Sequence, residues 1–497
     1  MGLATPSPTF TTLGCMDDIM PDIDLPMILS FPCPTSHRAI TQQRLYLSFT
    51  GLLDRDPWLR GYIHSNVTGV DGRYRRGTKL LIHGSSLSSD FNYLNEKDEK
   101  IEFQDLTSHA KYKDKTYPEL VAENMPAGYL SSTLLVPDRA TKHANVKHAL
   151  LAKVSFIREG IFVVVSTSHA LMDATSLAAI FGAWAATARG DVPAPLPHAP
   201  IWQPEYGLGA KSGEDTHTGE SKVSDSRGES EDLRGTAVLA QRIPSRSTVT
   251  AVFRIGAEAL ARLKEVCITQ DGRKEHGKGN EWISTNDALA ALLWRCIVRA
   301  RMTTPDLRTR TSSLMYAMDM RNSPVMAPGV LKTADGTSMA NTRLANIVFY
   351  SINRARVPVL LESISLSDTA RSIRTAIQKY TRPSIITRAL QLAAAIPDVS
   401  ALGLVYPTWV EHDVVISSLS RLPLYSTSWG DTFGEEVSGV PDIVRWPDGV
   451  FEGITFVMPR RRNGSVEIVI TMRTADMREL EKDAEWMSYV EDKIEIV

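Results

Sequence analysis

Residues 161–188 read IFVVVSTSHALMDATSLAAIFGAWAATA, and this stretch decides the fold class that we predict for the chain. The β-branched run Ile161–Val165 is typical of a buried strand. The segment 174–188 consists mostly of small and apolar residues, which favours a helix. His169 and Asp173 lie between the two, at the strand end where an open α/β sheet usually presents its functional side chains. The stretch therefore predicts an α/β protein with its chemistry at this strand end.

His169 is the strongest candidate for a catalytic side chain. Of the eleven histidines in the chain, it alone is followed by an aspartate four residues later. An imidazole held at the exit of a rigid strand is suited to act as a general base. From this pattern alone a second interpretation stays open, in which His169 only satisfies local backbone groups and Asp173 only caps the following helix.

Several blocks of sequence, in the same order along the chain, resemble those of the BAHD-type acyltransferases. The similarity is greatest to the fungal branch that includes trichothecene O-acetyltransferases. The blocks are Ser168–Ser176, Tyr117–Leu120 with Met125-Pro126, Ser284–Arg295, Asp319–Arg321 with Ala345-Asn346, and Ile416–Gly434. The last block departs from the family's D-F-G-W-G motif, because Ser428 stands at the aspartate position and Asp431 follows three residues later.

This resemblance implies two α/β domains of the chloramphenicol-acetyltransferase type with a channel between them. Acyl-CoA would enter one mouth of the channel, and an alcohol, or less readily an amine, would enter the other. His169 would take the proton of the acceptor hydroxyl as that hydroxyl attacks the thioester, so no covalent acyl-enzyme is needed. The expected reaction is transfer of an acyl group, most simply acetyl, to a hydroxyl of a specialised metabolite. Acyl-CoA is a co-substrate here, and the resemblance implies no metal or redox cofactor.

The resemblance also implies roles for residues around His169. Asp173 would form an ion pair that fixes the motif loop, and Arg321 is the matching partner. A simpler alternative for Arg321 is a solvated charge at a strand end.

Four further residues are candidates for the coenzyme site. Ser417 and Ser418 match polar positions near the thioester, where a hydroxyl can donate to the oxyanion. As an alternative, both are ordinary hydroxyls at a strand end. Trp429 and Gly430 would shape the interface between the domains beside the coenzyme channel.

The composition narrows the class of partner. The 497 residues carry a net charge of −2, which gives no reason to expect nucleic acid or an anionic membrane as a partner. The four cysteines have no C-x-x-C spacing, so we expect neither a disulfide framework nor a zinc site. No signal peptide is evident, and the longest stretch of low polarity, 177–188, is too short to span a bilayer. We expect a monomeric, cytoplasmic enzyme.

The chain divides into two predicted domains joined by a linker. We place an N-terminal domain at 1–195, a crossover linker at 196–250 and a C-terminal domain at 251–497. Within the linker, residues 211–235 lack aromatic residues and are rich in Ser, Gly and charged residues, a composition typical of disorder. A segment that binds a specific partner is the alternative for this stretch.

The expected elements follow from hydrophobic spacing. They are helices at 45–53, 174–188, 257–266 and 477–490, a helix that begins near Ser284, strands at 58–63 and 248–253, and hairpins formed by 149–158 with 160–168 and by 453–458 with 466–472.

Two other functions stay open at this point. A condensation-type enzyme that uses a carrier-bound thioester shares the expected fold, but Ser168 and Ala174 occupy positions where that class usually has a second His and a Gly. A catalytically inactive binding protein of the same fold is the other alternative, and the intact His169 argues against it. Slow release of thiol from acetyl-CoA would separate the enzymes from the binding protein.

Overall fold

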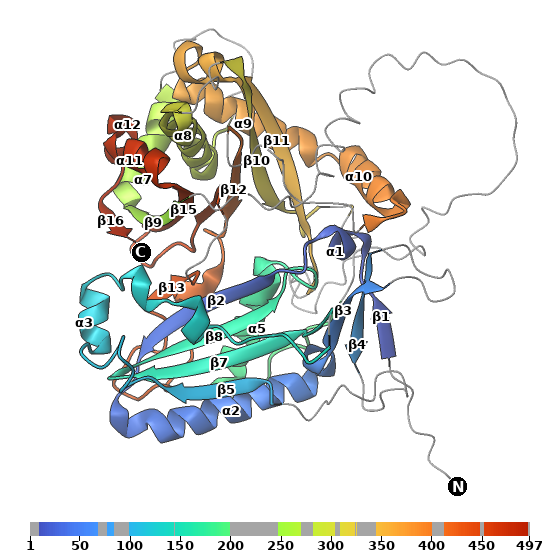
Figure 1. Cartoon of the computed structure of the whole chain (residues 1–497), viewed down its shortest axis with the longest axis vertical. Coiled ribbons are helices and arrows are strands. Elements are labelled where there is room, and N and C mark those ends of the chain that lie inside the picture. The colour runs from blue at the N-terminus through green and yellow to red at the C-terminus, as the bar shows by residue number, and fades with distance from the viewer. Residues whose placement is uncertain are drawn as a thin grey trace, which may run out of the picture.

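Three β-sheets with flanking helices make up the part of the chain that the structure, a computed structural model, describes. The described residues are 9–67, 77–83, 99–143, 145–198, 247–269, 282–303, 309–323, 325, 344–399, 412–447 and 452–495. Most of the predicted linker, residues 199–246, lies outside them. Figure 1 shows an N-terminal half in blue and green below a C-terminal half in yellow to red.

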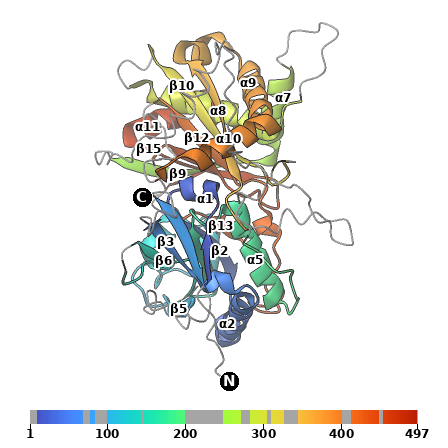
Figure 2. The ribbon, with the colours of Figure 1, turned by 90° about the vertical axis from the view of Figure 1, so that its right-hand side faces the viewer.

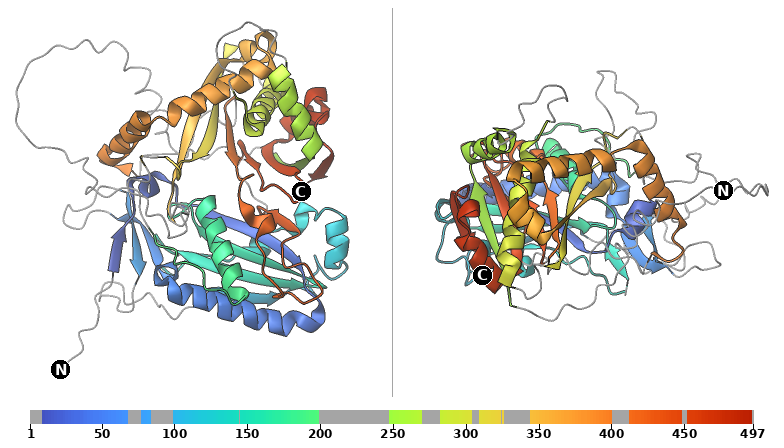
Figure 3. Two further views of the ribbon diagram at one scale, coloured as in Figure 1. Left: turned by 180° about the vertical axis from the view of Figure 1, so that it is seen from behind. Right: turned by 90° about the horizontal axis from the view of Figure 1, so that it is seen from above.

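The N-terminal half is built on a five-stranded sheet. Its order is β13 (Ile443–Arg445), β2 (Asp24–Pro32), β8 (Gly160–Ser168), β7 (Leu150–Ile157) and β5 (Ile101–Asp105). The predicted hairpin is confirmed, since β7 and β8 pair antiparallel. Every residue of β8 is buried, as the β-branched run indicates. Helix α2 (Arg38–Arg55) packs beside α5 (Ala174–Ala188), and Figure 3 shows α5 crossing one face of the sheet.

A smaller, four-stranded sheet flanks this one, and one of its strands begins later than predicted. Its order is β1 (Thr9–Thr12), β4 (Thr78–His83), β3 (Tyr62–Val67) and β6 (Val146–His148). The strand predicted at 58–63 is wrong in its first half, because Pro57–Arg60 forms a 3₁₀ turn, η2. Pro57 presets the helical φ at the start of that turn. The strand begins only after Gly61, where a Cβ would lie 2.6 Å from the carbonyl oxygen of Ile82.

Short helices complete the N-terminal half. They are α1 (Cys15–Ile19), α3 (Tyr117–Ala122) and α4 (Ser132–Leu135).

Among the described residues, no helix is both long and apolar enough to cross a membrane.

The C-terminal half is built on a seven-stranded mixed sheet. Its order is β11 (Val348–Arg356), β10 (Thr311–Asp319), β12 (Val414–Ser418), β14 (Ile454–Val457), β15 (Val466–Arg473), β9 (Thr248–Ile255) and β16 (Asp492–Glu495). The predicted hairpin of β14 and β15 is confirmed. Its helices are α7 (Ala257–Thr269), α8 (Thr285–Ala300), α9 (Leu366–Tyr380), α10 (Pro383–Ala395), α11 (Thr474–Lys482) and α12 (Ala484–Met487).

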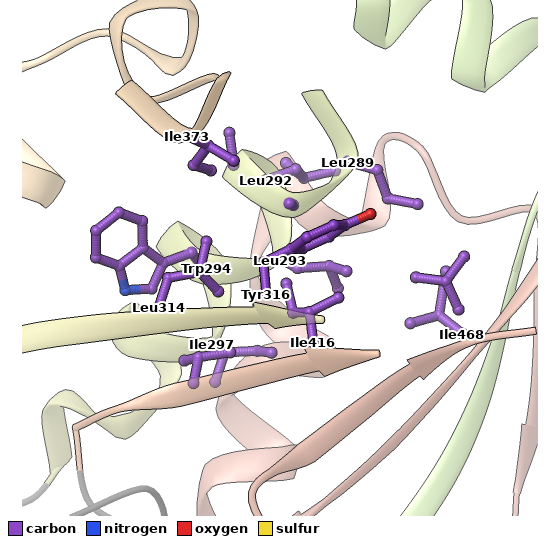
Figure 4. Packing of buried hydrophobic residues seen from close by; sticks show 14 of the residues in the cluster. Leu289, Leu292, Leu293, Trp294, Ile297, Leu314, Tyr316, Ile373, Ile416 and Ile468 are labelled. Carbon is purple, nitrogen blue, oxygen red and sulfur yellow. The ribbon is translucent and has the colours of Figure 1, made fainter. Parts of the chain in front are cut away.

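Helix α8 forms the centre of this half. Ser284 and Asp287 form the predicted capping box at its start, with each side chain accepting from the other's backbone N–H. The helix then buries nearly all of its residues between the sheet and helices α7, α9 and α11. Figure 4 shows the resulting cluster, in which side chains of α8 meet those of three strands: Leu289, Leu292, Leu293, Trp294, Ile297, Leu314, Tyr316, Ile416 and Ile468.

The helix predicted at 477–490 is wrong in its length. Helix α11 ends at Lys482, and the side chain of Asp483 accepts a hydrogen bond from the backbone N–H of Trp486. That carboxylate therefore starts a new helix, α12, because an aspartate at this position competes with a continuous helix for the backbone donors. The apolar residues keep their helical spacing across the break, which hides it in the sequence.

The two halves exchange segments. Cys15 and Met16 of α1 pack in the C-terminal core, and Figure 2 shows α1 at the junction of the two halves. In the other direction, β13 joins the N-terminal sheet by pairing with β2. Phe433 stacks on Phe31 of that sheet with ring centroids 4.0 Å apart. Five side chains from 424–444 thus pack in the core of the half that precedes them in the sequence: Leu424, Tyr425, Trp429, Phe433 and Val444.

A buried ion cluster secures this exchange. Glu467 on β15 accepts from Arg445 on β13, with Nε to Oε2 at 2.8 Å and Nη2 to Oε1 at 2.9 Å, and both side chains are 1% exposed. Arg254 and Arg461 also donate to Oε1. Burial opposes ionisation of Glu467, but the three arginines outweigh it and lower the pKa of the carboxyl to about 2.

We expect Glu467→Gln to cost about 3–5 kcal/mol of stability, because the substitution leaves buried arginines without their counter-charge. The whole loss of stability should be present at pH values above about 4.3, the pKa of a glutamate in the unfolded chain. It should shrink as the pH falls through the folded-state pKa of about 2, where the wild-type carboxyl is protonated too. Thermal melts of both proteins across this range measure the difference.

Glu102→Gln is the matched control, because Glu102, whose side chain is 56% exposed, pairs with Lys153 at 3.2 Å. It should change stability by less than about 1 kcal/mol. Equal melting temperatures for the wild type and the Glu467→Gln protein at neutral pH would contradict the structural role of the cluster.

Candidate active site

His169 follows directly after the last residue of strand β8, at the start of the loop that leads to α5. Its backbone N–H donates to the carbonyl oxygen of Ile23 at 2.9 Å, which extends the pairing of β8 with β2. The next three residues, 170–172, are fully buried. The histidine side chain itself is only half-buried, so it is accessible while its backbone is fixed.

Asn346 engages one side of the imidazole. Its Oδ1 lies 3.2 Å from His169 Nδ1, and its Nδ2 donates to the carbonyl oxygen of His169 at 2.8 Å. An amide oxygen can only accept, so this contact requires a hydrogen on Nδ1. In the neutral ring Nε2 is then the nitrogen that carries the free lone pair.

Asp173 makes no hydrogen bond to the imidazole among the described residues and pairs with Arg321, as predicted. The pair is bidentate, with Nη1 to Oδ2 at 2.9 Å and Nη2 to Oδ1 at 2.8 Å, and each side chain is 2% exposed. The alternative of a solvated charge at Arg321 is therefore wrong. Asp173 also caps α5 through the N–H of Ser176 at 2.9 Å and accepts from the N–H of Ile347 at 3.0 Å.

The charge of Asp173 is stabilised despite complete burial. Burial alone would raise the pKa of its carboxyl, but Arg321 and the two backbone donors outweigh it and hold the pKa below the usual range. Arg321 also donates to the carbonyl oxygen of Ala345 at 3.2 Å. The pair thus ties the His169 loop to the segment that carries Asn346.

A second buried carboxylate, that of Asp17 on α1, reaches the same segment. Its Oδ1 accepts from the backbone N–H of Asn346 at 3.0 Å and from Asn346 Nδ2 at 2.9 Å. Sequence reasoning missed Asp17, since no motif surrounds it and 329 residues separate it from Asn346. Asn346 was recognised only as part of a family block, and its contact with His169 was not foreseen.

Among the described residues, the predicted coenzyme-site residues share no hydrogen bond with this network. Ser417 and Ser418 end β12 and are half-buried, and Ser418 Oγ lies 3.0 Å from Ser420 Oγ. Trp429 is fully buried in the N-terminal half, 5.2 Å from the ring of Trp184. Its ring therefore presents no surface to a ligand and serves packing instead.

Gly430 has a structural reason to be glycine. Its φ of +60° is a left-handed conformation that side chains rarely adopt, and a Cβ would lie 3.0 Å from Arg189 Cγ. No hydrogen bond joins Gly430, Ser417 or Ser418 to His169 in the part of the chain that the structure describes.

One group among the described residues has a spacing suited to a metal ion, formed by Cys296, Asp483 and Glu485. Arg299 donates to both carboxylates, at 2.7 and 2.6 Å. One guanidinium already pairs with both acids, so the group is explained without a metal.

Comparison with known proteins agrees with this architecture. The model of the Transferase family matches residues 111–487, well over half of the chain. Eremophilane O-acetyltransferase ORF8 of Penicillium roqueforti is 23% identical over 502 residues, covering 96% of this chain and 97% of that protein.

Solved structures share the fold. The structure of Fusarium sporotrichioides TRI101 complexed with coenzyme A and T-2 has a TM-score of 0.73 at 19% identity, covering 97% of this chain and 99% of that one. Vinorine synthase has a TM-score of 0.58 at 14% identity, covering 99% and 95% of the two chains. These likenesses confirm the predicted α/β fold class of two chloramphenicol-acetyltransferase-like domains.

We expect Asp173→Asn to destabilise the protein by about 3–5 kcal/mol, because Arg321 loses its buried counter-charge. Turnover should fall further than affinity for acyl-CoA, since the loop that carries His169 loses its anchor. Thermal melts and the separate determination of kcat and KM measure both effects.

Asp319→Asn is the control. The Asp319 carboxylate accepts a hydrogen bond from the same arginine at 3.1 Å, but its side chain is 43% exposed, so its charge is not buried. This variant should stay close to the wild type. An Asp173→Asn protein with wild-type melting temperature and activity would rule out the anchoring role.

Proposed function

The chain belongs to the Transferase family and is an acyl-CoA-dependent O-acyltransferase, and from this premise we propose a donor and an acceptor. The proposed donor is acetyl-CoA, with no other cofactor, and the acceptor is a hydroxyl of a specialised metabolite. The full-length relative named eremophilane O-acetyltransferase supports this choice. The proposed enzyme works as a cytoplasmic monomer.

His169 is the proposed general base. Its Nε2 takes the proton of the acceptor hydroxyl while the hydroxyl oxygen bonds to the thioester carbonyl carbon. The tetrahedral intermediate then collapses, the carbon–sulfur bond breaks, and the imidazolium returns the proton to the leaving thiolate. The products are an ester and free coenzyme A. The observation that carries this proposal is the contact of Nδ1 with Asn346, which leaves Nε2 as the basic nitrogen.

Ser417 or Ser418 is the proposed donor to the oxyanion of that intermediate. Both hydroxyls stand at the carboxyl end of β12 and are half-buried, which suits a donor that a bound thioester would desolvate. In the same proposal the coenzyme lies in a channel between the two halves.

The first test is turnover. Purified protein should release thiol from acetyl-CoA when a hydroxylated eremophilane or trichothecene is supplied, and mass spectrometry should find the acetylated alcohol. His169→Ala should reduce turnover by about 10²–10⁴-fold with the fold intact. Near-normal turnover in this variant would remove His169 from the mechanism.

The order of the reaction gives a second test. Direct attack needs both substrates bound together, so initial-rate plots against both should intersect. A hidden nucleophile such as Cys33 or Ser168 would instead give parallel lines. It would also leave a stoichiometric acyl adduct after incubation with acetyl-CoA alone, and intact-protein mass spectrometry should find none.

A further inference from the structure

We infer that Asp17 is a positioning residue for the proposed acyl transfer: it holds the amide of Asn346 in the one orientation that leaves His169 Nε2 free to act as a base. The inference rests on the proposed function. Asp17 touches neither the imidazole nor a substrate, and it acts through Asn346.

The contacts of Asp17 are complete and buried. Its side chain is almost inaccessible, with the whole residue 1% exposed. Oδ1 accepts both donors of Asn346, the backbone N–H and Nδ2, and Oδ2 accepts the N–H of Gly14 at 3.0 Å. Oδ1 therefore acts as an acceptor toward Asn346, at a place where water does not compete.

This arrangement fixes which end of the amide faces the histidine. Nδ2 has two hydrogens, and one goes to Asp17 Oδ1 while the other goes to the carbonyl oxygen of His169. Oδ1 is left to face His169 Nδ1. A flipped amide would place its oxygen against two other oxygens, which is repulsive in a buried site.

The orientation of the amide decides the tautomer of the imidazole. Facing Oδ1, the ring keeps its hydrogen on Nδ1 and its lone pair on Nε2. Facing Nδ2, the ring would accept at Nδ1 and carry its hydrogen on Nε2. A ring in that second state cannot take a proton from an acceptor hydroxyl at Nε2.

The charge of Asp17 is not essential to this role. Burial raises the pKa of Asp17 to about 7, against the hydrogen bonds from Asn346 and Gly14 that lower it, and Asp18 raises it further. Lys79 faces the same turn, since its Nζ donates to the backbone oxygens of both aspartates. Whether Asp17 is ionised or protonated, its Oδ1 can accept the hydrogen bonds from Asn346. The role therefore requires an acceptor atom at this position and not a negative charge.

This distinction supplies matched variants. Asp17→Ala removes the acceptor, whereas Asp17→Asn can keep one toward Asn346 and gives up the bond from Gly14. Asp18→Ala is the control for damage to α1, because Asp18 is also buried but accepts from the N–H of Lys79 at 3.0 Å and not from Asn346.

We expect Asp17→Ala to lower kcat by about 10–100-fold, with KM for acetyl-CoA within about twofold. Asp17→Asn should restore most of the lost kcat, and Asp18→Ala should lose stability but keep kcat. Equal kcat in the Asp17→Ala and Asp18→Ala proteins would overturn the inference. If the alanine variant does not fold, Asp17→Ser, too short to reach Asn346, replaces it with the same expected loss.

Nitrogen-15 NMR of the imidazole gives a readout that does not need activity. The His169 resonances, assigned by their absence in His169→Ala, should show hydrogen on Nδ1 in the wild type and in Asp17→Asn, and on Nε2 in part or whole in Asp17→Ala. Hydrogen on Nε2 in the wild type, or no change in Asp17→Ala, would overturn the inference. If the expected tautomers appear but the wild type releases no thiol, the proposed function fails and the positioning role stands.

Discussion

The arrangement around His169 depends on the buried ion pair between Asp173 and Arg321. The pair joins the start of α5 in one half of the molecule to the residues just after β10 in the other, with both side chains 2% exposed. The same two side chains bind the backbone of Ala345 and Ile347 on either side of Asn346. The aspartate of the H-x-x-x-D pattern therefore makes its described hydrogen bonds to Arg321, Ser176 and Ile347 and none to the imidazole, and it fixes where His169 and Asn346 meet.

Buried ion pairs serve geometry more than stability. Removing two charges from water costs nearly as much as their attraction returns, so such a pair adds little net free energy over well-packed apolar residues. Its value here is that few arrangements of the two halves can satisfy it. The Arg445–Glu467 cluster acts the same way at the exchange of β13. Together the two clusters hold the halves at two separate places.

Local chemistry explains which features were predictable from the sequence. The strand before His169 and helix α5 follow from hydrophobic runs and a capping aspartate, which act within a few residues. The Asp173–Arg321 pair was predictable only because both residues belong to blocks that resemble a family. Asp17 gave no signal, because its role arises from a contact across 329 residues. The break at Asp483 was hidden because helical spacing continues through it.

A structure of the protein bound to coenzyme A would show whether Nε2 of His169 is the nitrogen presented to the reaction. We expect the coenzyme's sulfur to lie within hydrogen-bond reach of Nε2 while Nδ1 keeps its contact with Asn346. A sulfur bound beside Ser168 or Cys33, or an imidazole that has turned Nδ1 toward the coenzyme, would contradict it.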